Sequence, residues 1–108
     1  MAEIEIGLAE AGTLQTVTVG DELVVALDET PTSGYRWALE AFDDSIVALR
    51  DRTFVGPDHE RLGAAGSRRF RIAVIGPGET ALTFVNRRSW ERDAVGDRFE
   101  VTIDAQAG

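Results

Sequence analysis

Apolar and polar residues alternate along most of this chain, and this period of two constrains its fold more than any other feature. A β-strand points successive side chains to opposite faces, so alternation indicates strands with one buried face, whereas a helix repeats every 3.6 residues. The clearest stripes are Leu23, Val25 and Leu27; Tyr35, Trp37 and Leu39; Phe70, Ile72 and Val74; and Phe99, Val101 and Ile103. Further strands are expected at residues 4–8, 14–17, 46–55 and 80–86. The pattern predicts an all-β protein.

Turn-forming residues separate these runs, with glycine, proline and aspartate clustered between the stripes. Seven to eight short strands at this spacing are typical of a sandwich or a barrel. A tryptophan expected in the core, Trp37, favours an immunoglobulin-like β-sandwich, although the cysteine pair of antibody domains is missing. The one helix candidate, residues 42–46, is expected to form a turn instead because Asp43, Asp44 and Ser45 favour local side-chain hydrogen bonds.

A length of 108 residues allows one hydrophobic core, so we expect a single domain over residues 1–108 and a monomer. Hydrophobic residues make up 44% and charged residues 28%, which is ordinary for a globular protein. The chain has no cysteine, which excludes a disulfide framework, a thiol nucleophile and a zinc–thiolate site.

The formal net charge of -8 disfavours nucleic acid and anionic membranes as partners, because their phosphate groups would repel the molecule. No stretch is apolar enough for a membrane span, and residues 1–5 lack the basic start and apolar run of a signal peptide. The chain as given is therefore expected to be soluble. All 11 basic residues are arginine, which favours planar, bidentate contacts with a partner, although compositional bias of the genome explains the same observation and is the preferred interpretation.

Catalytic chemistry has little support in the sequence. The one histidine, His59, lies in a charged loop where it is expected to be solvated, and no serine follows a strand-to-helix elbow. The pair Asp43 and Asp44, and the pair Asp58 and Glu60, lack the ligand count of a metal site. We therefore expect no enzyme activity, no catalytic residue, no metal and no cofactor.

Three loop segments differ in composition from ordinary solvated turns. They contain Thr30, Pro31, Thr32, Ser33, Gly34 and Tyr35; Gly63, Ala64, Ala65 and Gly66; and Arg88, Ser89 and Trp90. Proline presets φ in the first segment and glycine permits a tight turn, so this loop can be slim and stiff. The glycines of the second segment allow close approach to another backbone, and tryptophan and arginine in the third are enriched in interface hot spots.

In this order and spacing the three segments resemble the chagasin family of cysteine-protease inhibitors. Its signature is an Asn-Pro-Thr-Thr-Gly-Tyr/Phe-x-Trp loop, a Gly-x-Gly-Gly loop and an Arg-Pro-Trp loop. The resemblance extends to residues 20–21, 70–72 and 76–80 and so covers nearly the whole chain. Thr30, Ala65 and Ser89 depart from the pattern, where the family has Asn, Gly and Pro.

The resemblance implies a reversible, non-covalent inhibitor of papain-like cysteine endopeptidases, in which three adjacent loops at one end of an immunoglobulin-like sandwich occlude the active-site cleft. Thr32 and Ser33 would then lie over the catalytic cysteine, residues 63–66 along one side of the cleft, and Arg88 with Trp90 on the other. The alternative is an immunoglobulin-like binding or adhesion module with a non-protease partner, which would use a sheet face or edge. Loss of papain activity on titration distinguishes the two.

Overall fold

The alternating segments form eight β-strands in the computed structural model, which describes residues 2–56, 66–88 and 95–108. The elements in chain order are β1 (Glu3–Ile6), η1 (Leu8–Glu10), β2 (Leu14–Thr18), β3 (Glu22–Glu29), η2 (Pro31–Ser33), β4 (Tyr35–Ala41), β5 (Val47–Val55), β6 (Gly66–Val74), β7 (Gly78–Arg88) and β8 (Val95–Gln106). The prediction of an all-β immunoglobulin-like sandwich is confirmed.

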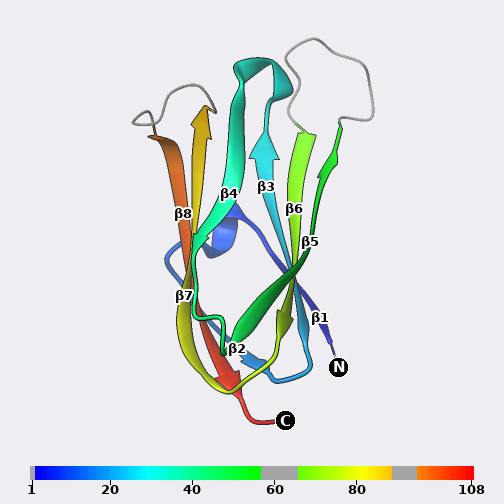
Figure 1. Cartoon of the computed structure of the whole chain (residues 1–108), viewed down its shortest axis with the longest axis vertical. Coiled ribbons are helices and arrows are strands. Elements are labelled where there is room, and N and C mark those ends of the chain that lie inside the picture. Colours follow the sequence, from blue (N-terminus) through cyan, green and yellow to red (C-terminus); the bar gives the residue numbers. More distant parts are fainter. Residues whose placement is uncertain (1, 57–65, 89–94) are drawn as a thin grey trace.

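The strands form two four-stranded sheets, with orders β1-β3-β6-β5 and β2-β8-β7-β4. The pairs β1–β3 and β2–β8 are parallel and all other pairs are antiparallel. The two described ends of the chain lie together at one end of the sandwich, and η2 lies at the other (Figure 1). From the strand orders, β1 and β5 are the edge strands of the first sheet, and β2 and β4 are those of the second.

The core lies between the sheets and contains the predicted inward stripes, except that Leu39 is only partly buried against it and Tyr35 lies outside it. The rings of Phe70 on β6 and Phe84 on β7 have centroids 5.0 Å apart, and Phe84 lies 5.8 Å from Phe99 on β8. Side chains from both sheets thus interdigitate, as aligned sandwiches require. Trp37 is 3% exposed, so its predicted burial is confirmed.

The outer faces differ from the predicted alternation at Val24 and Val85, which are 2% and 1% exposed. Val24 lies between Glu5 and Arg71 across neighbouring strands, and Val85 lies beside Arg98. Long charged side chains carry aliphatic stems that cover apolar neighbours. An outward valine is therefore buried without belonging to the core.

The end of the first strand differs from the prediction, whereas the turn before the fifth strand does not. The strand expected over residues 4–8 ends at Ile6, because the backbone folds into η1, where the N–H of Glu10 donates to the carbonyl of Gly7 at 3.0 Å. Leu8 is consequently 51% exposed. The turn at residues 42–46 is confirmed, since Asp43 Oδ1 accepts hydrogen bonds from the N–H and the hydroxyl of Ser45, at 2.9 and 2.6 Å.

Candidate functional site

Strand register brings the described strand ends that flank the three predicted loop segments to the same end of the sandwich. The cross-strand pairs that flank them are Glu29 with Gly66, Val55 with Ser67, Tyr35 with Arg88, and Arg87 with Val95. These pairs lie at the end that carries η2, opposite the two described ends of the chain (Figure 1). Residues as far apart in the sequence as Glu29 and Val95 are thereby placed at one end of the sandwich.

The first segment is a compact turn held by its own hydrogen bonds. The Ser33 hydroxyl donates to the carbonyl of Thr30 at 2.7 Å and accepts the N–H of Tyr35 at 3.2 Å. The Ser33 N–H donates to the same Thr30 carbonyl at 3.1 Å. Gly34 has φ = 79°, a left-handed conformation that favours glycine. The segment therefore has one braced backbone shape, although Thr30 stands where the family pattern has Asn.

The two residues expected at the tip have different environments. The Ser33 hydroxyl is engaged within the loop and is half-buried, whereas the side chain of Thr32 is exposed. Thr32 is therefore the hydroxyl residue of this turn that is presented to solvent. Ser33 shapes the backbone around it.

Arg88, at the end of β7, holds the first segment in place. Its guanidinium carbon lies 4.6 Å from the centre of the Tyr35 ring, a cation–π distance, and its Nε donates to the carbonyl of Ser33 at 3.3 Å. The residue predicted as a protease contact thus also connects β7 to the loop before β4.

A buried carboxylate supports the base of the same segment. Glu29 is 3% exposed, and its Oε1 accepts the N–H of Trp37 at 2.7 Å. Its Oε2 accepts two hydrogen bonds from Arg68, at 3.1 Å from Nε and 2.8 Å from Nη2. The Arg68 guanidinium in turn lies over the Phe54 ring, 5.2 Å from its centre. Because β3 and β6 belong to one sheet and β4 to the other, Glu29 joins the two sheets beside the loop.

Sequence reasoning missed this network, although a signal was present. Glu29 continues the stripe of Leu23, Val25 and Leu27, so period two places it inward. A carboxylate at an inward position needs a buried partner, because an unpaired buried charge is strongly unfavourable. The sequence does not identify Arg68, 39 residues away, as that partner.

Several predicted residues lie outside the part of the chain that the structure describes. They are Gly63, Ala64, Ala65, Ser89 and Trp90, together with His59, Asp58 and Glu60. Gly66 is described and begins β6. A Cβ added there would lie 2.4 Å from Cζ of Phe54 and 2.5 Å from the carbonyl oxygen of Val55, so the position requires glycine.

Within residues 2–56, 66–88 and 95–108, no group of three or more His, Asp or Glu side chains could hold a metal ion. The part of the chain that the structure describes likewise contains no helix long and apolar enough to cross a membrane. The described groups at the η2 end are backbone groups, hydroxyls, the Tyr35 ring, arginines and the buried carboxylate of Glu29.

The sequence matches the family described as chagasin family peptidase inhibitor I42 over residues 16–103. The chain belongs to the chagasin family. This is a family of peptidase inhibitors and not of enzymes. Chagasin of Trypanosoma cruzi is 29% identical over 103 residues, which cover 90% of this chain and 93% of chagasin.

Solved structures of similar proteins share the fold. EhICP2, a cysteine protease inhibitor from Entamoeba histolytica, has a TM-score of 0.87 at 18% identity, covering 97% of this chain and 96% of its own. PbICP-C, solved in complex with falcipain-2, has a TM-score of 0.76 at 14% identity, covering 95% of this chain and 99% of its own. The chagasin-family match includes all three loop segments, since residues 30–35, 63–66 and 88–90 fall within it.

Proposed function

We propose that this chagasin-family chain inhibits papain-like cysteine proteases by occluding their active-site cleft with the three loop segments. The proposed contacts are Thr30, Pro31, Thr32, Ser33, Gly34 and Tyr35; Gly63, Ala64, Ala65 and Gly66; and Arg88, Ser89 and Trp90. The observation that carries the proposal is the convergence of the flanking strand ends at one end of the sandwich. A relative of the same fold, PbICP-C, has been solved in complex with falcipain-2.

The bracing of the first segment supports a mechanism of steric blockage. Ser33, Gly34 and Arg88 hold one backbone conformation before any partner binds. A loop that is ordered in advance loses little conformational entropy on docking, so more of the contact energy appears as affinity. The mechanism needs no cofactor, because the cleft is filled and no bond is made or broken.

Titration of papain with the purified protein tests the proposal, and we expect stoichiometric loss of activity. Thr32→Glu should weaken inhibition at least tenfold, because it adds a charge to the exposed residue of the turn. Thr16→Glu is the matched control, since Thr16 is an exposed threonine on β2. Full papain activity at excess protein would refute the proposal and favour a module with a non-protease partner. Equal inhibition by both variants would refute the role of the first segment.

A further inference from the structure

The open edge of β4 is closed by side chains directly beside the first loop segment. At Tyr35 and Trp37 the backbone groups that face away from β7 bond to side chains. Tyr35 N–H donates to Ser33 Oγ, Tyr35 C=O accepts from Arg36 Nη1 at 3.1 Å, Trp37 N–H donates to Glu29 Oε1, and Trp37 C=O accepts from Arg52 Nη2 at 3.1 Å. An edge whose groups are satisfied in this way is a poor template for another strand. Partners must therefore meet this edge through side chains.

The side chains presented there are two cations, Arg36 and Arg52, which we call the arginine edge. Both residues are exposed, and neither has an ion pair among the described residues. Arg68, Arg71 and Arg87, by contrast, are paired with Glu29, Glu22 and Glu40. Each guanidinium of the arginine edge uses one of its five N–H groups on a β4 carbonyl, which fixes its position and leaves a donor fork for a ligand.

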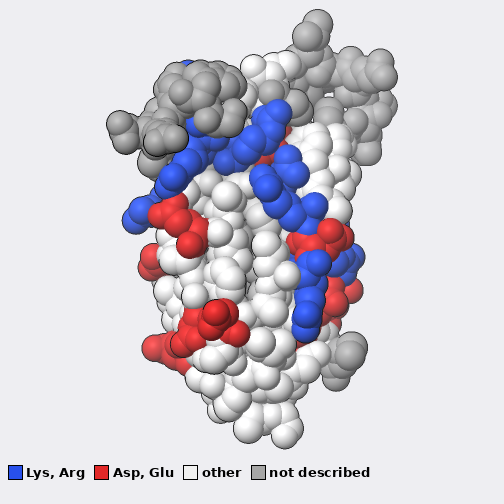
Figure 2. Space-filling model, in the orientation of Figure 1, with Lys and Arg blue, Asp and Glu red and all other residues white. Residues whose placement is uncertain are grey.

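Further arginines lie beside the arginine edge, although the whole chain carries a net charge of -8 and Asp51 precedes Arg52. Arg36 lies across from Arg87, which is paired with Glu40, and Arg88 is the next residue along β7. Basic side chains gather in the upper part of the visible face, below the η2 end, whereas acidic side chains are more frequent lower down (Figure 2). An anionic partner is therefore attracted to this part of the surface despite the net charge.

We infer that the arginine edge is a second contact surface, which binds acidic side chains on the rim of the protease cleft. The inference rests on the proposed function, because it assumes that the first segment docks into that cleft. Arg36 lies two positions beyond Gly34, and Arg52 bonds to the carbonyl of Trp37, so a body that receives the loop also faces both guanidiniums. The guanidinium fork matches a carboxylate through two parallel hydrogen bonds.

Rim contacts of this kind govern the association rate and the choice of partner more than the final affinity. The arginine edge therefore makes the inhibitor selective, among papain-like proteases, for those whose cleft is bordered by Asp and Glu. A protease with a neutral or basic rim would be inhibited through the loops alone and would associate more slowly.

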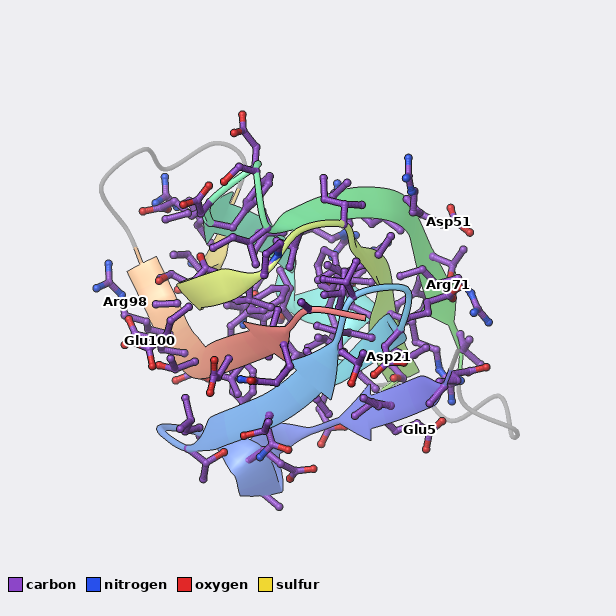
Figure 3. All side chains as sticks on the ribbon, turned by 90° about the horizontal axis from the view of Figure 1, so that it is seen from below. Glu5, Asp21, Asp51, Arg71, Arg98 and Glu100 are labelled. Atoms are coloured by element: carbon purple, nitrogen blue, oxygen red, sulfur yellow. The ribbon has the colours of Figure 1, made fainter. Side chains whose placement is uncertain are left out.

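The test compares two double variants. The arginine-edge variant carries Arg36→Gln and Arg52→Gln, and the control variant carries Arg69→Gln and Arg98→Gln. The control removes the same charge from two exposed arginines that have no described ion pair, on β6 and β8. Arg98 lies on the opposite side of the molecule from Asp51, the residue that precedes Arg52 on β5 (Figure 3). Association rate constants are measured by progress curves with two papain-like proteases, one with an acidic rim and one with a neutral rim.

With the acidic-rim protease at about 20 mM salt we expect association to slow about tenfold for the arginine-edge variant and less than about twofold for the control. The difference should shrink to about twofold at about 500 mM salt, where charges are screened over about 4 Å. With the neutral-rim protease both variants should match the parent. If Arg52→Gln lowers the melting temperature, Arg36→Gln is tested alone, because it removes only a hydrogen bond to the carbonyl of the preceding residue, Tyr35. This single variant should show part of the slower association.

Equal association rates for the arginine-edge variant and the control, with the parent still an inhibitor, would overturn this inference and leave the proposed function standing. Failure of the parent to inhibit either protease would overturn both.

Discussion

At the scale of single residues, the least expected feature is the buried pair of Glu29 and Arg68. The Glu29 side chain is 1% exposed and that of Arg68 is 14% exposed. Arg68→Ala leaves the carboxylate buried with one hydrogen bond, from Trp37, and should lower the free energy of unfolding by about 3–5 kcal/mol. Urea unfolding measures this loss of stability. Arg69→Ala is the control and should lower the free energy of unfolding by less than about 1 kcal/mol, because Arg69 is exposed.

A second variant separates the charge from the packing. Glu29→Gln combined with Arg68→Met removes both charges and should recover much of the stability that Arg68→Ala loses, because replacing both partners of a buried ion pair is often close to neutral. If the double variant is no more stable than Arg68→Ala, the carboxylate is not the cause of the loss.

Two carboxylates link stability to acid pH. The pKa of Asp21 is lowered because it accepts hydrogen bonds from the backbone N–H groups of Thr18 and Ala2, both at 3.0 Å. The pKa of Asp43 is lowered by the hydroxyl and the N–H of Ser45. A carboxyl group whose folded pKa lies below its unfolded value of about 3.9 stabilises the fold above that pH. This stabilisation is lost as the pH falls through the folded pKa.

We therefore expect the free energy of unfolding to fall below about pH 4, and to fall less steeply in Asp21→Asn and Asp43→Asn. Asp44→Asn is the control, since the Asp44 carboxylate, next to Asp43 in the same turn, has no hydrogen bond among the described residues. Thermal unfolding between about pH 2 and pH 6 gives the slope of the free energy of unfolding against pH for each variant. A slope for Asp21→Asn as steep as that of Asp44→Asn would contradict the assignment.

At the scale of elements, β4 combines three roles along seven residues. Trp37 packs in the core, its indole N–H donates to the carbonyl of Asp28 at 2.8 Å, and its backbone groups bond to Glu29 and Arg52. This one strand therefore joins the core to the base of the loop. A substitution of Trp37 should therefore lower the free energy of unfolding more than it weakens inhibition by the folded protein.

Trp37→Ala should accordingly lower the free energy of unfolding by about 3–5 kcal/mol, the usual effect of emptying an aromatic core site. Trp37→Phe retains much of the packing and leaves the Asp28 carbonyl without its indole donor, so we expect a smaller loss of about 1–3 kcal/mol. Chemical denaturation measures both. A loss below about 1 kcal/mol for the alanine variant would show that Trp37 is not a core residue.

The sequence predicted the strands well because alternation is a local property that burial enforces along each strand. It placed the end of β1 two residues too far, since the turn at Gly7 depends on hydrogen bonds that alternation does not encode. It indicated the residues of the first loop segment but not their geometry. The hydrogen bond of the Ser33 hydroxyl within its own loop and the pairing of Glu29 with Arg68 depend on which groups lie close together in the folded chain. The alternation of apolar and polar residues does not contain this information.

At the scale of the whole molecule, the proposed mechanism predicts that inhibition does not depend on chemistry at the protease's catalytic cysteine. The described part of the η2 end offers no thiol or other strong nucleophile. Its braced turn would block the protease cleft by its volume alone. A papain-like protease with that cysteine changed to Ala should therefore bind within about tenfold of the native enzyme, or roughly 1.4 kcal/mol. Calorimetry on both forms measures this. A covalent adduct by mass spectrometry, or cleavage within residues 30–36, would identify a trapped substrate instead.

The placement of both described chain ends opposite η2 has a practical consequence (Figure 1). A linker, a dye or a fused domain attached at residue 2 or residue 108 starts from the far side of the sandwich and leaves the loop end unobstructed. The protein can thus be anchored to a sensor chip by either end with the same surface facing the solution. Protease capture should then proceed at equal rates in the two orientations.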